Sequence, residues 1–132
     1  MNKVVVRFAD GRIIKGTTAD FLPTKDIFHV NMSTEPVGAK PLEVNKNELK
    51  ALFFVKDFGG DAKHVESNKF DPTHPPAGRR ISVLFKDGEV LIGTTTGYQK
   101  DRPGFFLVPA DEDSNVERCY IVTAATAEIS FV

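Results

Sequence analysis

The chain has 132 residues, with 17 Lys and Arg against 18 Asp and Glu for a net charge of −1, and 41% of its residues are hydrophobic. A chain of this length buries roughly two thirds of its unfolded surface, which allows one ordinary core or two small ones. The balanced charge argues against a protein that coats nucleic acid electrostatically, and no apolar run approaches the roughly 20 residues that a membrane-spanning helix needs.

The cysteine content and the first residues bear on the cellular compartment. Cys119 is the only cysteine, so the chain has no internal disulfide. Residues 1–4 lack the apolar stretch and the small-residue cleavage site of a secretory signal. We therefore expect a cytoplasmic protein.

An internal repeat organises the sequence. Residues 4–55 align with residues 81–132 without a gap when the chain is shifted on itself by 77 positions. This self-similarity predicts two copies of one small domain, the first at residues 1–58 and the second at residues 81–132, joined by a linker at residues 59–80. The identical pairs include Val6 with Val83, Phe8 with Phe85, Asp10-Gly11 with Asp87-Gly88, Gly16-Thr17-Thr18 with Gly93-Thr94-Thr95, Phe28 with Phe105, and Phe54-Val55 with Phe131-Val132.

Each copy begins with a predicted β-hairpin. Residues 4–8 and 81–85 are rich in β-branched and aromatic side chains, and each run is followed by an Asp-Gly pair, which is the strongest short hairpin signal. The apolar pattern resumes at residues 13–17 and 90–95. Two matching hairpins are therefore expected.

Three further strands are predicted in each copy. A third strand is expected near residues 27–32 or 104–109, and a closing pair near residues 42–44 and 49–55, or 119–122 and 127–132. The alanine-rich residues 123–127 are too few for a stable helix, so we interpret them as a tight turn or a single 3₁₀ turn. Short strands separated by turn signals predict an all-β protein made of two small closed or nearly closed barrels.

The glycine spacing resembles a known small barrel. Phe8-x-x-Gly11-x-x-x-x-Gly16, which recurs as Phe85-x-x-Gly88-x-x-x-x-Gly93, resembles the first motif of the Sm-like barrels, and residues 44–55 are similar to the second. The broader SH3-like barrels share this strand pattern. The resemblance implies two tandem five-stranded SH3-like or Sm-like barrels related by internal duplication. The whole chain also looks like a bacterial family of two-barrel proteins without assigned function.

The departures from the Sm-like pattern bear on RNA binding. Sm-like proteins that bind RNA have an Asp and an Asn in the loop after the second strand, and neither copy carries that Asn. Residues 45–48 and 122–125 stand where the Arg-Gly or Lys-Gly pair of the second motif belongs. The RNA pocket of that family is therefore not reproduced in this sequence.

Four charged residues are candidates for ligand or partner binding. Arg79-Arg80 resembles the arginine-rich entry of the PilZ domains, which bind a cyclic dinucleotide, but the Asp-x-Ser-x-x-Gly that follows in that family is missing. An arginine pair on a strand edge is the alternative. Asp111 and Asp113 belong to an acidic loop, which either is a solvated surface or receives a basic partner segment.

The linker holds the residue types that ligate metals. Asp61, His64, Asp71 and His74 are chemically suitable for zinc, but loops of this kind more often carry such residues as solvated polar groups. No Ser/His/Asp, Cys/His or paired-carboxylate constellation recurs in the two copies. We therefore expect no cofactor, no metal and no catalysis.

The apolar ends of the two copies predict a contact. Residues 52–55 and 129–132 are continuous apolar runs, which indicate strands covered on both faces. Packing of the two barrels together is the simplest cover, and a homodimer is the next. Phe53 aligns with Ser130, so we expect Phe53 at a contact between barrels or between chains.

These observations favour a non-catalytic module that binds a protein, a peptide or another ligand of unknown specificity. The alternative is binding of RNA or of a nucleotide, such as a cyclic dinucleotide, through the barrel surface. Arg12, Lys15, Lys25 and Lys40 would form the basic face that such binding needs, but acidic neighbours dilute it.

Overall fold

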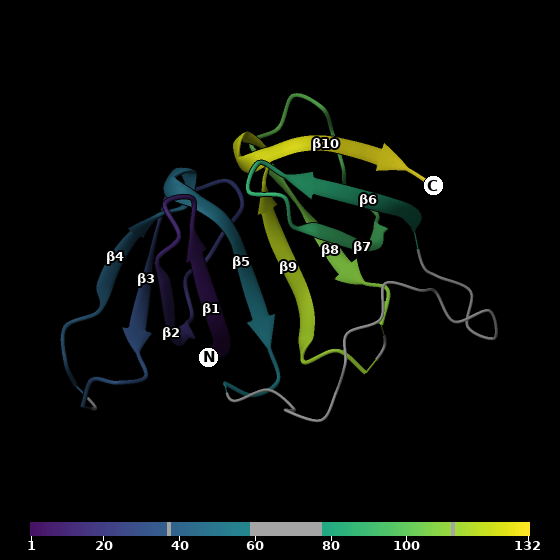
Figure 1. The fold of residues 1–132 in the computed structure, drawn as a ribbon. Helices are drawn as coiled ribbons and strands as arrows, with labels where there is room; N and C mark the ends of the chain where they lie inside the picture. Colours follow the sequence, from purple (N-terminus) through teal and green to yellow (C-terminus); the bar gives the residue numbers. More distant parts are fainter. Residues whose placement is uncertain (37, 59–77, 112) are drawn as a thin grey trace.

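The computed structural model describes residues 1–36, 38–58, 78–111 and 113–132, and ten strands and two 3₁₀ turns lie within them. The N-terminal half comprises β1 to β5 and the turn η1, and the C-terminal half comprises β6 to β10 and the turn η2 (Figure 1). The bounds in the N-terminal half are β1 Asn2–Phe8, β2 Ile13–Thr18, β3 Ile27–Met32, β4 Leu42–Asn45, η1 Lys46–Glu48 and β5 Leu49–Val55. Those in the C-terminal half are β6 Arg79–Phe85, β7 Val90–Thr95, β8 Gly104–Pro109, β9 Val116–Val122, η2 Thr123–Ala125 and β10 Thr126–Phe131.

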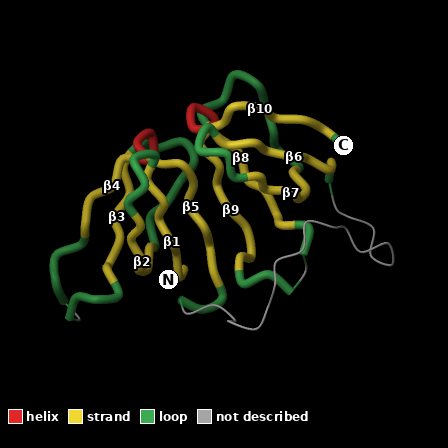
Figure 2. The backbone as a smooth tube through the Cα atoms, viewed as in Figure 1, coloured by secondary structure: helices red, strands yellow, loops and turns green. Residues whose placement is uncertain are grey.

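Local sequence signals account for the turns. Gly11 and Gly88 close the two Asp-Gly hairpins with φ angles of 99° and 95°, a region that glycine enters without steric cost. The predicted 3₁₀ turn is confirmed at Thr123–Ala125. Its counterpart η1 lies at the same end of the molecule, as the two red segments of Figure 2 show.

All ten strands belong to one antiparallel sheet. The strand order is β10-β6-β7-β8-β9-β5-β1-β2-β3-β4, so the two halves follow the same internal order and meet where β9 pairs with β5. This differs from the expected pair of closed barrels: among the described residues, β4 does not pair with β5, nor β9 with β10. The physical reason is that β5 takes its second partner strand from the other half.

The β5–β9 pairing explains the apolar run that precedes the linker. All seven residues of β5 are buried. Leu52 and Phe54 belong to the core of the N-terminal half, whereas Ala51, Phe53 and Val55 belong to the core of the C-terminal half. This strand in the middle of the sheet therefore has an apolar side chain at every position except Lys50, because each of its faces is covered by a different core. Figure 1 shows β5 and β9 side by side between the two halves.

The C-terminal half begins earlier than predicted. β6 starts at Arg79, so Arg79 and Arg80 belong to a strand and not to the linker. The other predicted linker residues up to position 77, including Asp61, His64, Asp71 and His74, lie outside the described residues. Within the described part of the chain, no helix is both long and apolar enough to cross a membrane.

Candidate functional site

The junction between the halves is the best-developed feature of the structure. Across β5 and β9, Leu52 lies opposite Tyr120 and Phe53 lies opposite Cys119. Tyr120 belongs to the core of the N-terminal half, although it comes from the C-terminal half. The two halves thus exchange core residues across the paired strands, which fastens them together by apolar burial.

A group of four charged residues spans one end of the junction. The Lys50 ammonium donates to Asp87 at 2.7 Å and also to Glu89, and the Arg7 guanidinium donates to Glu89 at 2.9 Å. Lys50 is only 4% exposed and lies 4.6 Å from the centre of the Phe85 ring. We call Arg7, Lys50, Asp87 and Glu89 the ion-pair cluster.

The ion-pair cluster perturbs one of its carboxyl groups. The hydrogen bond from the Lys50 side chain, followed by one from the Glu89 backbone N–H, lowers the pKa of Asp87 below its ordinary value. Asp87 therefore stays ionised at neutral pH, opposite the buried ammonium. Each charge in the cluster has an opposite partner, so the cluster holds the two halves in register and keeps no unpaired group for acid–base chemistry.

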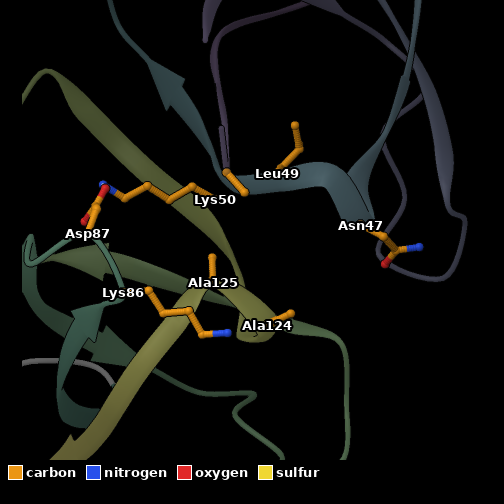
Figure 3. Close-up of a pocket in the computed structure, with 8 residues that line it drawn as sticks. Asn47, Leu49, Lys50, Lys86, Asp87, Ala124 and Ala125 are labelled. Carbon is orange, nitrogen blue, oxygen red and sulfur yellow. The ribbon is translucent and has the colours of Figure 1, made fainter. Parts of the chain in front are cut away.

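A cleft of about 220 Å³ lies beside the cluster. Figure 3 shows Lys50 reaching toward Asp87 along one wall, with Lys86 and the alanines of η2 along another. The cleft is smaller than the roughly 300 Å³ at which small-molecule sites begin. Its lining residues are Ala9, Asn47, Leu49 and Lys50 from the N-terminal half, and Lys86, Asp87, Ala124 and Ala125 from the C-terminal half.

The two ends of the sheet form a second candidate site. β10 and β4 are the terminal strands, and no other described strand pairs with their outer edges. The backbone N–H of Val132 donates to the carbonyl oxygen of Arg80 on β6, and the backbone N–H of Lys46 donates to the carbonyl oxygen of Asp26 beside β3. Alternate N–H groups point to opposite sides of a strand, so those of Ile129 and Phe131 on β10, and of Glu43 and Asn45 on β4, point outward.

An aromatic pair lies beside the free edge of β10. The rings of Tyr98 and Phe131 are 5.4 Å apart, and the Arg79 guanidinium lies 3.7 Å from the centre of the Phe131 ring. These three residues line a hollow of about 230 Å³ together with Thr95 and Thr96. Phe131 is 37% exposed, whereas its sequence counterpart Phe54 is 4% exposed.

The structure places the five predicted site residues in three parts of the fold. Phe53 lies on β5 at the junction, in the core of the C-terminal half. Arg79 and Arg80 lie on β6 opposite Thr95 and Thr94. Asp111 and Asp113 lie in the turn between β8 and β9, where the Asp113 N–H donates to the Asp111 carboxylate at 2.9 Å. Among these residues, only Arg79 lines one of the cavities described above.

The ion-pair cluster was missed by reasoning from the sequence. Asp87 was interpreted only as part of a hairpin turn, which it also is. The available signal was Lys50, the only charged residue of the apolar strand β5, because a buried lysine in such a run needs an anionic partner. Which carboxylates supply that anion depends on the β5–β9 pairing.

Comparison with known proteins adds a family and no activity. The family model "Family of unknown function (DUF6982)" matches residues 1–132. The chain belongs to this DUF6982 family. Neither the curated proteins nor the solved structures contain a significant match. The resemblance of this DUF6982 protein to Sm-like and SH3-like barrels therefore rests on its sequence pattern.

A metal site in this DUF6982 protein would need several His, Cys, Asp or Glu side chains in one place. Among its described residues, no three His, Cys, Asp or Glu side chains gather where they could hold a metal ion. The closest comparable pair is His29 with Asp20, whose ring nitrogen and carboxylate oxygen are 2.7 Å apart. Partial burial raises the pKa of Asp20, but hydrogen bonds from the His29 backbone and ring and from Thr18 outweigh this effect and bring that pKa below its ordinary value. This pair ties β3 to the end of β2.

The thiol at the junction of the DUF6982 protein is expected to be unreactive. Cys119 is fully buried, and its burial, followed by the charge of Glu89, raises its pKa from 9.0 to about 12. We expect iodoacetamide to leave the native thiol unmodified even at about pH 10, because alkylation requires an accessible thiolate. Mass spectrometry of native and urea-unfolded protein measures this, and alkylation of native protein at the rate of a free cysteine would contradict it.

The ion-pair cluster is expected to be costly to break from its acidic side. In Asp87→Asn with Glu89→Gln the buried Lys50 ammonium has no carboxylate partner, so we expect a clearly lower melting temperature than that of the wild type. Adding Lys50→Met to that double variant should restore most of the loss. Lys50→Met alone should change the free energy of unfolding by less than about 1 kcal/mol, because the exposed carboxylates regain water. Equal melting temperatures for the double and triple variants would contradict this.

Proposed function

We propose that this protein is a non-catalytic interaction module that binds an extended polypeptide strand at the free edge of β10. The observation that carries the proposal is the end of the sheet at β10, where the outward N–H groups of Ile129 and Phe131 have no strand partner among the described residues. An exposed sheet edge is a template for strand addition, in which main-chain hydrogen bonds supply affinity.

The surroundings of β10 supply a side-chain site for such a partner. Specificity in strand addition comes from pockets that take alternate side chains of the added strand. The hollow lined by Arg79, Tyr98 and Phe131 opens beside β10 and combines a guanidinium with two aromatic rings. A partner side chain that carries a carboxylate fits this combination, because its charge pairs with Arg79.

Other features also favour binding over catalysis. The four charged groups of the ion-pair cluster are paired with each other, and Cys119 is held as a protonated, buried thiol. The same strand order in both halves, with a separate core for each, supports two copies of a bent Sm-like or SH3-like unit. In this proposal the second copy keeps its last strand open, whereas the first copy has used its own in the junction.

Peptide selection tests the proposal. Peptides chosen from a random phage-displayed library against the wild type are measured by fluorescence anisotropy on Phe131→Pro, which removes one outward N–H, and on Phe131→Leu, which keeps it. We expect Phe131→Pro to lower the affinity for the peptide by about tenfold, because it removes one backbone hydrogen bond and disturbs the adjacent bonds of the ladder. Phe131→Leu should lower the affinity by less than about threefold. Equal affinities for the two variants would overturn strand addition at β10.

Nucleotide binding is the second candidate function. The observation in its favour is the hollow itself, because an arginine stacked on an aromatic ring next to a second ring is suited to a base and its phosphate. A thermal-shift titration with cyclic dinucleotides and short RNA tests it. A shift that is lost in Arg79→Ala would support a nucleotide site, and the absence of a shift with the wild type would exclude these ligands.

A further inference from the structure

We propose that the strand bound by β10 is β4 of a second copy of this chain, so that copies assemble head to tail. This inference rests on the proposed strand addition at β10 and names its partner. The template is the junction inside the chain, where the last strand of one half, β5, pairs with the fourth strand of the other half, β9. Such an interface is heterologous, so it leaves one unused surface of each kind: β10, the last strand, and β4, the fourth.

The register inside the chain predicts the register between copies. Leu52 lies opposite Tyr120 in the junction. Their counterparts under the sequence alignment are Ile129 and Glu43, so Ile129 should lie opposite Glu43 of the second copy. Both of these residues direct their backbone N–H groups outward, because Val132 and Lys46, each three residues further along, direct theirs inward to β6 and to the residue before β3. The transferred register therefore brings together two positions that can exchange hydrogen bonds, which a register shifted by one residue would not do.

The aromatic pair beside β10 has a covered counterpart inside the chain. Tyr98 and Phe131 correspond to Phe21 and Phe54. The Phe21 ring has Tyr120 at 5.2 Å and Phe106 at 6.3 Å, both supplied by the other half. Among the described residues no strand lies beyond β10 to cover the Tyr98–Phe131 pair, and Phe131 stays 37% exposed. A second copy would supply this cover at the hollow.

Charge complementarity also favours a second copy. Glu43 stands where Tyr120 stands in the junction, and Tyr120 packs on Phe21, the counterpart of Tyr98. The carboxylate of Glu43 of the second copy would thus enter the hollow that Arg79 lines with Tyr98. This pairing is of opposite charges, whereas the corresponding contact inside the chain is the aromatic one between Phe21 and Tyr120.

The contact between copies should be weaker than the internal junction. On β10, Glu128 and Ser130 replace Ala51 and Phe53, which are buried in the junction. Fewer apolar side chains can be buried, and Pro41, immediately before β4, offers no N–H to extend the ladder. We therefore expect assembly that is reversible and depends on concentration.

Mixing two edge-blocked variants tests the head-to-tail geometry. Glu43→Pro blocks β4 and leaves β10 intact, whereas Phe131→Pro blocks β10 and leaves β4 intact; neither removes an N–H that bonds within the chain. Sedimentation velocity between about 1 μM and 1 mM, the range of weak association, should give assemblies larger than one chain for the wild type and single chains for each variant alone. An equal mixture should give a species of two chains and nothing larger. Glu43→Asp and Phe131→Leu, which keep the N–H groups, should still assemble.

Three outcomes would overturn the inference. The first is a wild type that stays a single chain throughout the concentration range. The second is association of Glu43→Pro alone, which would indicate that β10 pairs with itself. The third is a mixture without a two-chain species, although both variants keep the wild-type circular dichroism spectrum and a protected Cys119. A single-chain wild type whose selected peptides still lose affinity in Phe131→Pro would reject the second copy and leave strand addition standing. Failure of both measurements would reject both proposals.

Discussion

Replacing Gly93 by alanine is expected to lower the free energy of unfolding by about 3 kcal/mol or more. Gly93 lies on β7 where the neighbouring strand β8 passes closely, and a Cβ there would overlap the Val108 carbonyl oxygen and lie 2.6 Å from Leu107 Cδ2. A clash with backbone cannot be relieved by rotating a side chain, so β7 and β8 would have to separate.

Gly97→Ala is the matched control for that substitution. A Cβ at Gly97 meets nothing within 4 Å, so this variant should stay within about 0.5 kcal/mol of the wild type. Urea denaturation followed by circular dichroism measures both. A Gly93→Ala protein as stable as Gly97→Ala would show that the close approach of β7 to β8 is wrong.

Phe54→Ala is expected to cost about 3–5 kcal/mol, and Phe131→Ala about 1 kcal/mol, although the two residues occupy the same place in the aligned halves. Phe54 is 4% exposed within the core that both halves share, and its ring lies 6.3 Å from that of Phe106. Phe131 is 37% exposed on a terminal strand. Removing the first ring leaves a cavity, whereas water fills the space left by the second.

Denaturation of the two alanine variants should be measured at low protein concentration, where copies do not associate. Phe53→Ala provides an additional comparison, because Phe53 faces the core of the C-terminal half from a strand of the N-terminal half. Similar losses for Phe54→Ala and Phe131→Ala would mean that β10 is covered as completely as the central strand β5, which would contradict the terminal position of β10.

The sequence predicted the local structure well, because its signals are local. Alternating apolar residues and the Asp-Gly turns at Gly11 and Gly88 depend on φ preferences and on neighbouring side chains, and the hairpins appear where expected. The strand after the linker was predicted to start at residue 81, but β6 begins at Arg79, where pairing with Thr95 extends it. Strand ends depend on the partner strand, which the local sequence does not contain.

The candidate sites were less predictable than the strands. The sequence shows Arg79 only as half of a basic pair, and its stacking on Phe131 arises only because β10 pairs with β6. Lys50 and Asp87 are 37 residues apart in the chain, and no local pattern links them. Their contact follows from the β5–β9 pairing, which brings the turn between β6 and β7 next to β5.

The sequence by itself determined that this is an all-β chain with two similar halves, the turns that separate its strands, and the unusual character of the run that contains Phe53. The tertiary structure decided that β5 pairs with β9, that each of these strands serves two cores, and that β4 and β10 are left at the ends of one open sheet. The physical reason is that strand propensity and turn geometry act over a few residues, whereas the choice between closing each half and joining the two is made by long-range pairing and by which apolar faces can be buried together.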